Sequence, residues 1–152
     1  MNLNDPVPDF SIPTTSGQIF SLSAYRGKNV VIYFYPKDST PGCTTQGQNF
    51  RDLYPDFLAA NTVILGVSRD SLKSHENFKA KQEFPFELGS DSDEALCQLF
   101  DVIKMKKMYG KEVRGIERST FVIAADNRIL HSWRGVKVDG HAVEVLTFIK
   151  AL

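Results

Sequence analysis

The sequence predicts an α/β fold in which a central mixed sheet is flanked by helices. Three hydrophobic runs, rich in β-branched and aromatic residues, have the length and composition of strands that are covered on both faces. These runs are residues 29–35, 62–67 and 119–124. Segments with helical spacing separate them, so strand and helix alternate along the chain.

A hairpin and a helix are predicted around the first of these strands. Short apolar patterns at residues 10–12 and 19–22 favour a hairpin ahead of the sheet. After the strand, Thr40 suits the N-cap of a helix and Pro41 suits its first position. Pro55 should kink or split this helix, because its ring blocks a backbone hydrogen bond. The hydrophobic residues at helical spacing are Phe50, Leu53, Tyr54, Phe57 and Leu58.

The second half of the chain predicts three more helices and a second hairpin. Capping residues favour helices at 70–81 and 90–101, and the final segment, 140–152, favours a third. Its apolar stripe consists of Val143, Leu146 and Ile149. A turn at 126–127 joins the third strand to a fourth at 129–133, so these two strands should be antiparallel. The short lysine run at 104–107, in the segment inserted before the third strand, is typical of a solvated loop.

This order of elements is typical of a thioredoxin-like sandwich with an N-terminal hairpin extension. We expect one such domain over residues 1–152, because no repeat, linker or low-complexity stretch divides the chain.

Composition excludes several classes of function. Lys plus Arg and Asp plus Glu each number 18, so there is no basic excess of the kind that binds nucleic acid or anionic membrane. The longest apolar run is too short to cross a bilayer, and the first residues lack the pattern of a signal peptide. Two cysteines in 152 residues are not a disulfide framework, which favours a reducing compartment and a cytoplasmic location.

The candidate nucleophile is Cys43. By the count from Thr40, it occupies the third position of the first helix, where backbone N–H groups have no helical partner. These groups and the helix dipole favour the thiolate over the thiol. We also expect the Thr40 hydroxyl to accept from an N–H beside the sulfur. If the third strand runs antiparallel to the first, Arg118 lies at the same sheet edge and brings a cation to the sulfur.

Ionisation alone does not make such a thiol a fast catalyst. Full ionisation of an ordinary thiol at neutral pH accelerates its reactions about 30-fold, or about 2 kcal/mol. Any larger acceleration requires donors that stabilise charge on the leaving atom of the substrate. The available donors are the Thr40 hydroxyl, the Cys43 N–H and the Arg118 guanidinium.

The pattern Pro36-x-x-x-Thr40-x-x-Cys43 resembles the peroxidatic motif of peroxiredoxins, and the surrounding string resembles the bacterioferritin-comigratory class, also called PrxQ. The likeness extends over residues 33–44, 65–68, 107–111 and 115–121. It implies reduction of hydrogen peroxide and organic hydroperoxides through a sulfenic acid, with re-reduction by thioredoxin or another thiol. It further implies a monomer without metal or organic cofactor, in which Pro36 shields a centre formed by Thr40, Cys43 and Arg118.

The sequence departs from this class at the resolving cysteine. Some members carry it five residues after the peroxidatic one, where this chain has Gln48, and others carry it in the next long helix, where residues 77–80 have none. Cys97 remains, and it lies among apolar residues of a predicted helix. Either Cys97 is a packed core residue and an outside thiol resolves Cys43, or local unfolding brings the two cysteines together.

Two other interpretations compete with a peroxidase. A disulfide reductase of the Cys-x-x-Cys type would need a cysteine where Gln46 stands. A redox-sensing or holdase-like binding protein could use Cys43 as a switch without turnover. His75, His131 and His141 are scattered in the sequence without the spacing of metal ligands, so we expect structural or solvated histidines.

Overall fold

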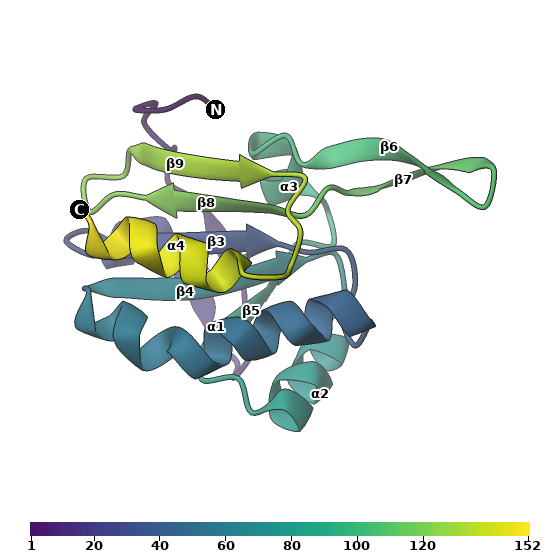
Figure 1. The fold of residues 1–152 in the computed structure, drawn as a ribbon, viewed down its shortest axis with the longest axis horizontal. Helices are drawn as coiled ribbons and strands as arrows, with labels where there is room; N and C mark the ends of the chain where they lie inside the picture. The colour runs from purple at the N-terminus through teal and green to yellow at the C-terminus, as the bar shows by residue number, and fades with distance from the viewer.

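The computed structural model describes residues 1–152 and is built on a five-stranded mixed sheet (Figure 1). β3 is the central strand; it pairs in parallel with β4 and antiparallel with β8, while β5 and β9 form the edges. In sheet order the strands are β5 (Glu87–Ser90), β4 (Thr62–Ser68), β3 (Asn29–Phe34), β8 (Ser119–Ile123) and β9 (Ile129–Arg134).

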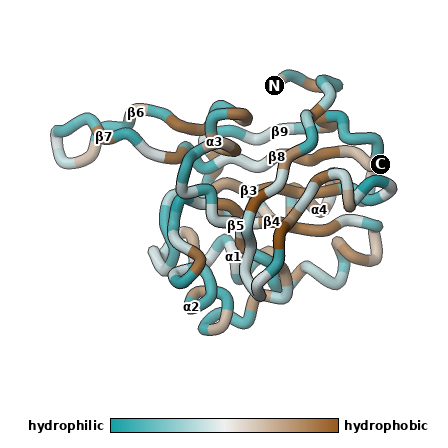
Figure 2. The backbone as a smooth tube through the Cα atoms, turned by 180° about the vertical axis from the view of Figure 1, so that it is seen from behind, coloured by the Kyte–Doolittle hydropathy of each residue, from teal (hydrophilic) through white to brown (hydrophobic).

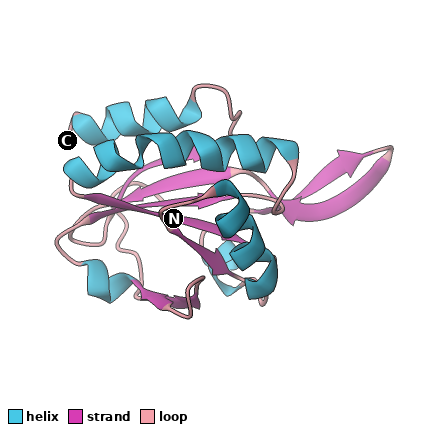
Figure 3. Ribbon diagram, turned by 90° about the horizontal axis from the view of Figure 1, so that it is seen from below, coloured by secondary structure: helices cyan, strands magenta, loops and turns pink.

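Two layers cover the sheet, and they are seen edge-on in Figure 3. One face carries the helices α1 (Pro41–Ala59), α2 (Leu72–Gln82) and α4 (His141–Lys150). The opposite face carries α3 (Ala95–Leu99), the hairpin of β1 (Ser11–Pro13) and β2 (Ile19–Ser21), and the 3-10 turn Leu22–Tyr25. No helix of the structure combines the length and the apolar character that crossing a membrane requires.

The alternation of side chains along β3 explains why the molecule has two cores. Val31 and Tyr33 pack under α1 and α4, whereas Ile32 and Phe34 pack under α3 and the N-terminal hairpin. All four side chains are buried, as expected for a central strand that is hydrophobic on both faces. Figure 2 shows the hydrophobic segments in these central strands and hydrophilic segments at the periphery.

The structure confirms the predicted central strands, the N-terminal hairpin and the antiparallel pair of β8 and β9. It also confirms α2, which begins after Ser71, whose hydroxyl accepts a hydrogen bond from the N–H of Ser74 at 3.2 Å. The strand direction on which the placement of Arg118 depended is the required one, because β8 runs antiparallel to β3.

Two strand assignments differ from the prediction. β5 is missing from the prediction, because its four residues carry no periodic pattern and become a strand by pairing with β4. The lysine run at 104–107 is not a loop, but lies in β6 (Ile103–Met108), which pairs with β7 (Lys111–Ile116) in a hairpin that projects from the sheet (Figure 1). Residues 103–106 alternate between apolar residues and lysines, a pattern that suits a strand as well as a loop.

Three details of the helices also differ. α1 continues through Pro55, so the expected split is wrong; Pro55 is exposed, and water can satisfy the carbonyl group that lacks its helical partner. α3 is shorter than predicted, because Ser90 belongs to β5, residues 91–94 form a turn and the helix ends at Leu99. In α4, Val143 is 58% exposed, and the buried stripe is formed instead by Ala142, Val145, Leu146 and Ile149.

Gly47 permits the close packing of α1 against Phe84, so we predict that Gly47→Ala lowers the free energy of unfolding by about 2 kcal/mol. A methyl group at this position would overlap the ring of Phe84. That ring cannot easily withdraw, because it stacks on Phe86 at 5.3 Å and meets Phe78 edge-on at 5.0 Å. Urea unfolding measures the change. Thr45→Ala, at an exposed position of the same helix, is the control and should not destabilise; equal stability of Gly47→Ala and wild type would contradict the prediction.

Candidate active site around Cys43

The candidate residues meet at the end of the sheet where the central strand β3 finishes and α1 begins (Figure 1). A loop of residues 35–40 connects the two elements. Ser39 in this loop has a φ of 62°, a left-handed conformation that directs the chain into the helix. Pro36 lies half-buried at the beginning of the loop.

Cys43 lies in the first turn of α1, at the third helical position, as predicted. Its side chain is 2% exposed and packs in the same core as Tyr33 and Phe50. The backbone N–H groups of Gly42 and Cys43 donate to no protein acceptor. The sulfur therefore lies at the positive end of a 19-residue helix, next to two donors that are available to a bound anion.

Thr40 is the N-cap residue, but its hydroxyl does not make the expected capping hydrogen bond. The hydroxyl donates instead to the carbonyl oxygen of Lys37 at 2.8 Å. A carbonyl oxygen can only accept, so the proton of the Thr40 hydroxyl is committed to this bond. What Thr40 presents beyond it is an acceptor oxygen, and the sequence-based expectation of a donor at this position is corrected accordingly.

Arg118 lies directly before β8 and reaches the first turn of α1. Its Nη2 is 3.5 Å from Cys43 Sγ, and its Nη1 donates to Gln46 Oε1 at 2.6 Å. A methyl group on Gly42 would approach Nη2 to 3.2 Å, so glycine at this position leaves room for the guanidinium. The structure thus brings Arg118 and Cys43 together across 75 residues of sequence.

Gln46 is a further residue of the site, which the sequence indicated only as the absence of a second cysteine. It lies three residues after Cys43, on the same face of α1, and it is 1% exposed. Its Oε1 orients Arg118, while its Nε2 is buried without a hydrogen-bond partner. Helical spacing from Cys43 is the sequence signal that could have identified it.

Lys106 brings a second cation to the same region from the middle of β6. Its Nζ donates to the carbonyl oxygen of Ile116, two residues before Arg118. Burial lowers the pKa of Lys106, and the nearby Arg118 cation adds to this effect. The expectation that this lysine lies in a solvated loop is wrong, because the pairing of β6 with β7 directs it toward the site.

Cys97 lies apart from this site. It is fully buried in α3, in the core on the opposite face of the sheet from Cys43. Burial raises the pKa of Cys97 above its usual range, and the neighbouring Asp91 carboxylate raises it further. Both cysteines are free thiols.

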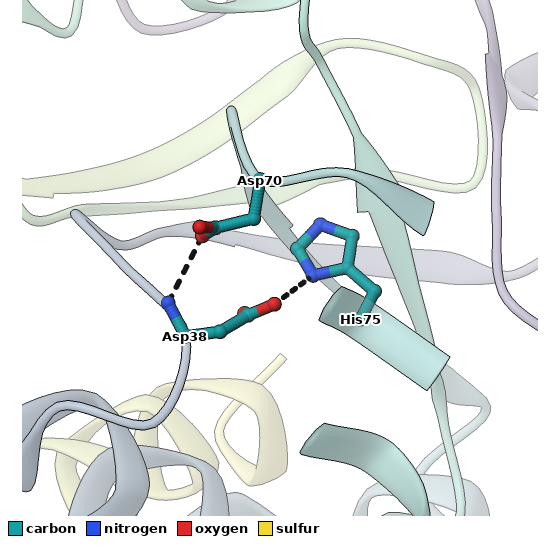
Figure 4. A group of neighbouring side chains, drawn as sticks. All are labelled: Asp38, Asp70 and His75. Atoms are coloured by element: carbon teal, nitrogen blue, oxygen red, sulfur yellow. Dashed lines mark hydrogen bonds and ion pairs between the residues drawn. The ribbon is translucent and has the colours of Figure 1, made fainter. Parts of the chain in front are cut away.

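The buried histidines have structural partners. His141 Nε2 is 2.8 Å from Thr120 Oγ1, and burial lowers the pKa of His141 to about 4, so its ring is neutral at pH 7. His75 meets Asp38 and Asp70, with ligand atoms within 4.8 Å of one another, a grouping that the sequence spacing did not predict (Figure 4). Each aspartate carboxylate has a hydrogen-bond partner within the protein, and so does each ring nitrogen of His75. This suits a polar network without an ion.

This arrangement has a defined chemical capability. A thiolate at Cys43 would lie beside the Arg118 guanidinium and the unpaired N–H groups at the start of α1, in a buried position from which most water is excluded. Such a site stabilises negative charge on sulfur before reaction and on an adjacent oxygen during it. It therefore fits nucleophilic attack by sulfur on a small oxygen-containing substrate.

Comparison with protein-family models matches residues 3–132 to the AhpC/TSA family. Peroxiredoxin Bcp of Xanthomonas campestris pv. campestris is 57% identical over 148 residues, which cover 96% of this chain and 92% of the relative. Peroxiredoxin Bcp of Bacillus subtilis is 45% identical over 150 residues, which cover 99% of this chain and 96% of the relative.

Solved structures give the same result. The PrxQ of Xylella fastidiosa, in a form with one cysteine replaced by serine, superimposes with a TM-score of 0.95 at 50% identity, covering 99% of this chain and 96% of its own. The bacterioferritin comigratory protein of Xanthomonas campestris, studied for its alkyl peroxide reduction activity, gives a TM-score of 0.89 at 56% identity, covering 93% of this chain and 90% of its own. These similarities confirm the thioredoxin-like fold.

Proposed function

Because this chain belongs to the AhpC/TSA family and is a peroxiredoxin, a thiol-dependent peroxidase, we propose that Cys43 is the thiol that attacks the peroxide. One observation supports this assignment above the others: Cys43 Sγ lies at the start of α1, 3.5 Å from Arg118 Nη2. As substrates we propose hydrogen peroxide and organic hydroperoxides, since the similar Xanthomonas campestris protein is described by its reduction of alkyl peroxides.

The proposed reaction transfers two electrons from sulfur to the peroxide. The Cys43 thiolate attacks the oxygen atom that carries the hydrogen of the hydroperoxide. A sulfur–oxygen bond forms while the oxygen–oxygen bond breaks, which leaves a sulfenic acid on Cys43. The other oxygen departs as alkoxide or hydroxide, takes up a proton and is released as an alcohol or water.

The neighbouring groups divide the work of binding and stabilisation. Arg118 and the Cys43 N–H donate to the peroxide oxygens, where negative charge grows as the oxygen–oxygen bond breaks. Thr40 accepts the hydrogen of the hydroperoxide, because its own proton is held by Lys37. Pro36, half-buried at the beginning of the loop, shields the sulfur from water. Gln46 positions Arg118 by accepting from its Nη1.

We further propose that an outside thiol, such as thioredoxin, resolves the sulfenic acid. Cys97 is fully buried on the opposite face of the sheet, where its raised pKa keeps it protonated and unreactive. One outside thiol displaces water from Cys43 to form a mixed disulfide, and a second releases the Cys43 thiol. Two free cysteines are compatible with a monomer that works in the cytoplasm, where such thiols are abundant.

Cys43→Ser should abolish peroxide consumption, because a hydroxyl oxygen cannot be oxidised as sulfur is. Wild type should consume about one peroxide for every two thiols oxidised in a turnover assay, which follows from the two-electron chemistry. Cys97→Ser is the matched control and should retain most of the activity. Retained turnover in Cys43→Ser would contradict the assignment of Cys43, and loss of turnover in Cys97→Ser would contradict resolution by an outside thiol. Absence of turnover in wild type would favour a binding protein that uses Cys43 as a switch.

Arg118→Ala should slow single-turnover oxidation of Cys43 by hydrogen peroxide about 100-fold, which is the usual loss for one stabilising donor at a reacting oxygen. Stopped-flow fluorescence of Trp133 or mass analysis of quenched samples can follow the reaction. The matched control is Arg114→Ala, since Arg114 binds the carboxylate of Glu94 outside the site and its loss should leave the rate nearly unchanged. Thr40→Val, which removes the proposed acceptor, should also slow the reaction; equal rates in the Thr40 and Arg118 variants and wild type would remove both roles.

Intact-mass analysis distinguishes the two routes of resolution. After one equivalent of peroxide and no thiol, we expect wild type to gain the mass of one oxygen atom, because Cys97 is not positioned to react. Addition of a small thiol should then give the mixed-disulfide mass on Cys43. A loss of two hydrogen atoms with no added oxygen would instead show a Cys43–Cys97 disulfide and contradict external resolution.

A further inference from the structure

A buried polar hub anchors the loop that carries the active site. Asp38, in the middle of this loop, is 6% exposed although its neighbours Lys37 and Ser39 are exposed. Its carboxylate receives hydrogen bonds from the Tyr35 hydroxyl at 2.6 Å and the Ser74 hydroxyl at 2.8 Å. Its side chain therefore points into the protein, while the chain on either side of it faces solvent.

His75 completes the set of partners around this carboxylate. It is fully buried in α2, and its Nδ1 lies 2.7 Å from Asp38 Oδ2 (Figure 4). Its Nε2 lies 2.9 Å from the carbonyl oxygen of Gly89. A carbonyl oxygen only accepts, so Nε2 carries a proton. The contact between Nδ1 and Oδ2 then holds a second proton, and it is a strong hydrogen bond in a region without competing water.

The backbone of Asp38 is fixed as well. Its N–H donates at 2.9 Å to Oδ2 of Asp70 (Figure 4). The same oxygen accepts from the Ser68 hydroxyl at 2.6 Å. Asp70 follows β4, and His75 lies in α2, so the loop is tied to two elements of the scaffold. The other hydrogen bond from a side chain of residues 36–43 to the rest of the protein joins Cys43 to Arg118.

We propose that the Asp38–His75 pair is a latch that sets how often the Cys43 loop opens. The peroxide is small and reaches Cys43 in the closed form, but a thiol carried by a protein cannot approach a sulfur that is 2% exposed. The loop must therefore move away from the sheet for resolution, and the latch opposes that movement. Asp38, His75 and Tyr35 are positioning residues in this proposal, which rests on the proposed role of Cys43.

Labelling of reduced Cys43 with a maleimide that carries a polyethylene glycol chain tests the latch, because this bulky reagent reacts only with the open form. Peptide mass analysis separates label on Cys43 from label on Cys97. Tyr35→Phe and Ser74→Ala each remove one hydrogen bond to a carboxylate, so each should accelerate labelling about 10-fold. His75→Gln should accelerate it more, about 100-fold. Oxidation by hydrogen peroxide should change less than about 3-fold in the two hydroxyl variants, since the closed form still predominates.

Asp91→Asn is the matched control for general loss of stability. Asp91 is a buried carboxylate that accepts from the N–H groups of Leu96 and Cys97, away from the loop. Compared with a latch variant that loses the same unfolding free energy in urea, Asp91→Asn should leave the labelling rate of Cys43 unchanged. The latch is overturned if Tyr35→Phe and Ser74→Ala label no faster than Asp91→Asn, whether or not His75→Gln folds. Faster labelling in a protein whose Cys43 does not react with peroxide would support the latch and overturn the proposed function.

Discussion

The antiparallel pairing of β3 with β8 is the constraint on which the active site depends. Its register sets Phe34 opposite Ser119, so the end of β3 and the start of β8 lie at the same end of the sheet. Because β4 runs parallel to β3, the crossover helix α1 must begin at this end of the sheet as well. The start of α1 and the Arg118 guanidinium therefore lie next to one sulfur. If β8 ran parallel to β3, Arg118 would lie at the opposite end of the sheet.

Burial of Cys43 has opposing effects on the chemistry at this end of the sheet. Exclusion of water strengthens the interaction of Cys43 with Arg118 and with the helix dipole, which would favour the proposed attack on a small peroxide. The same exclusion prevents contact with a protein thiol. Placing the sulfur beside a loop, with Asp38 as an anchor, allows local movement while the sheet remains intact. A buried hub of this kind is stable only when every polar atom has a partner, as the contacts of Asp38 and His75 show.

Local patterns in the sequence were sufficient for the central strands, for α2 and for the position of Cys43. Apolar runs identified strands that are buried on both faces, and the Thr40–Pro41 pair placed Cys43 at the third position of α1. These features depend on contacts within a few residues, so the sequence displays them directly. The same reasoning failed for β5 and for the hairpin of β6 and β7, because pairing with a neighbouring strand is what makes these segments strands.

The sequence by itself therefore determined the proposed nucleophile, the helix start that holds it and the class of fold. Only the tertiary structure decided which groups surround it: Arg118 lies 75 residues from Cys43, and His75 lies 37 residues from Asp38. It also decided that Thr40 presents an acceptor and that Cys97 lies in the other core. The physical reason is that helical and strand periods act over a few residues, whereas the direction of strands and the side of the sheet on which a residue lies are set by packing of the whole chain.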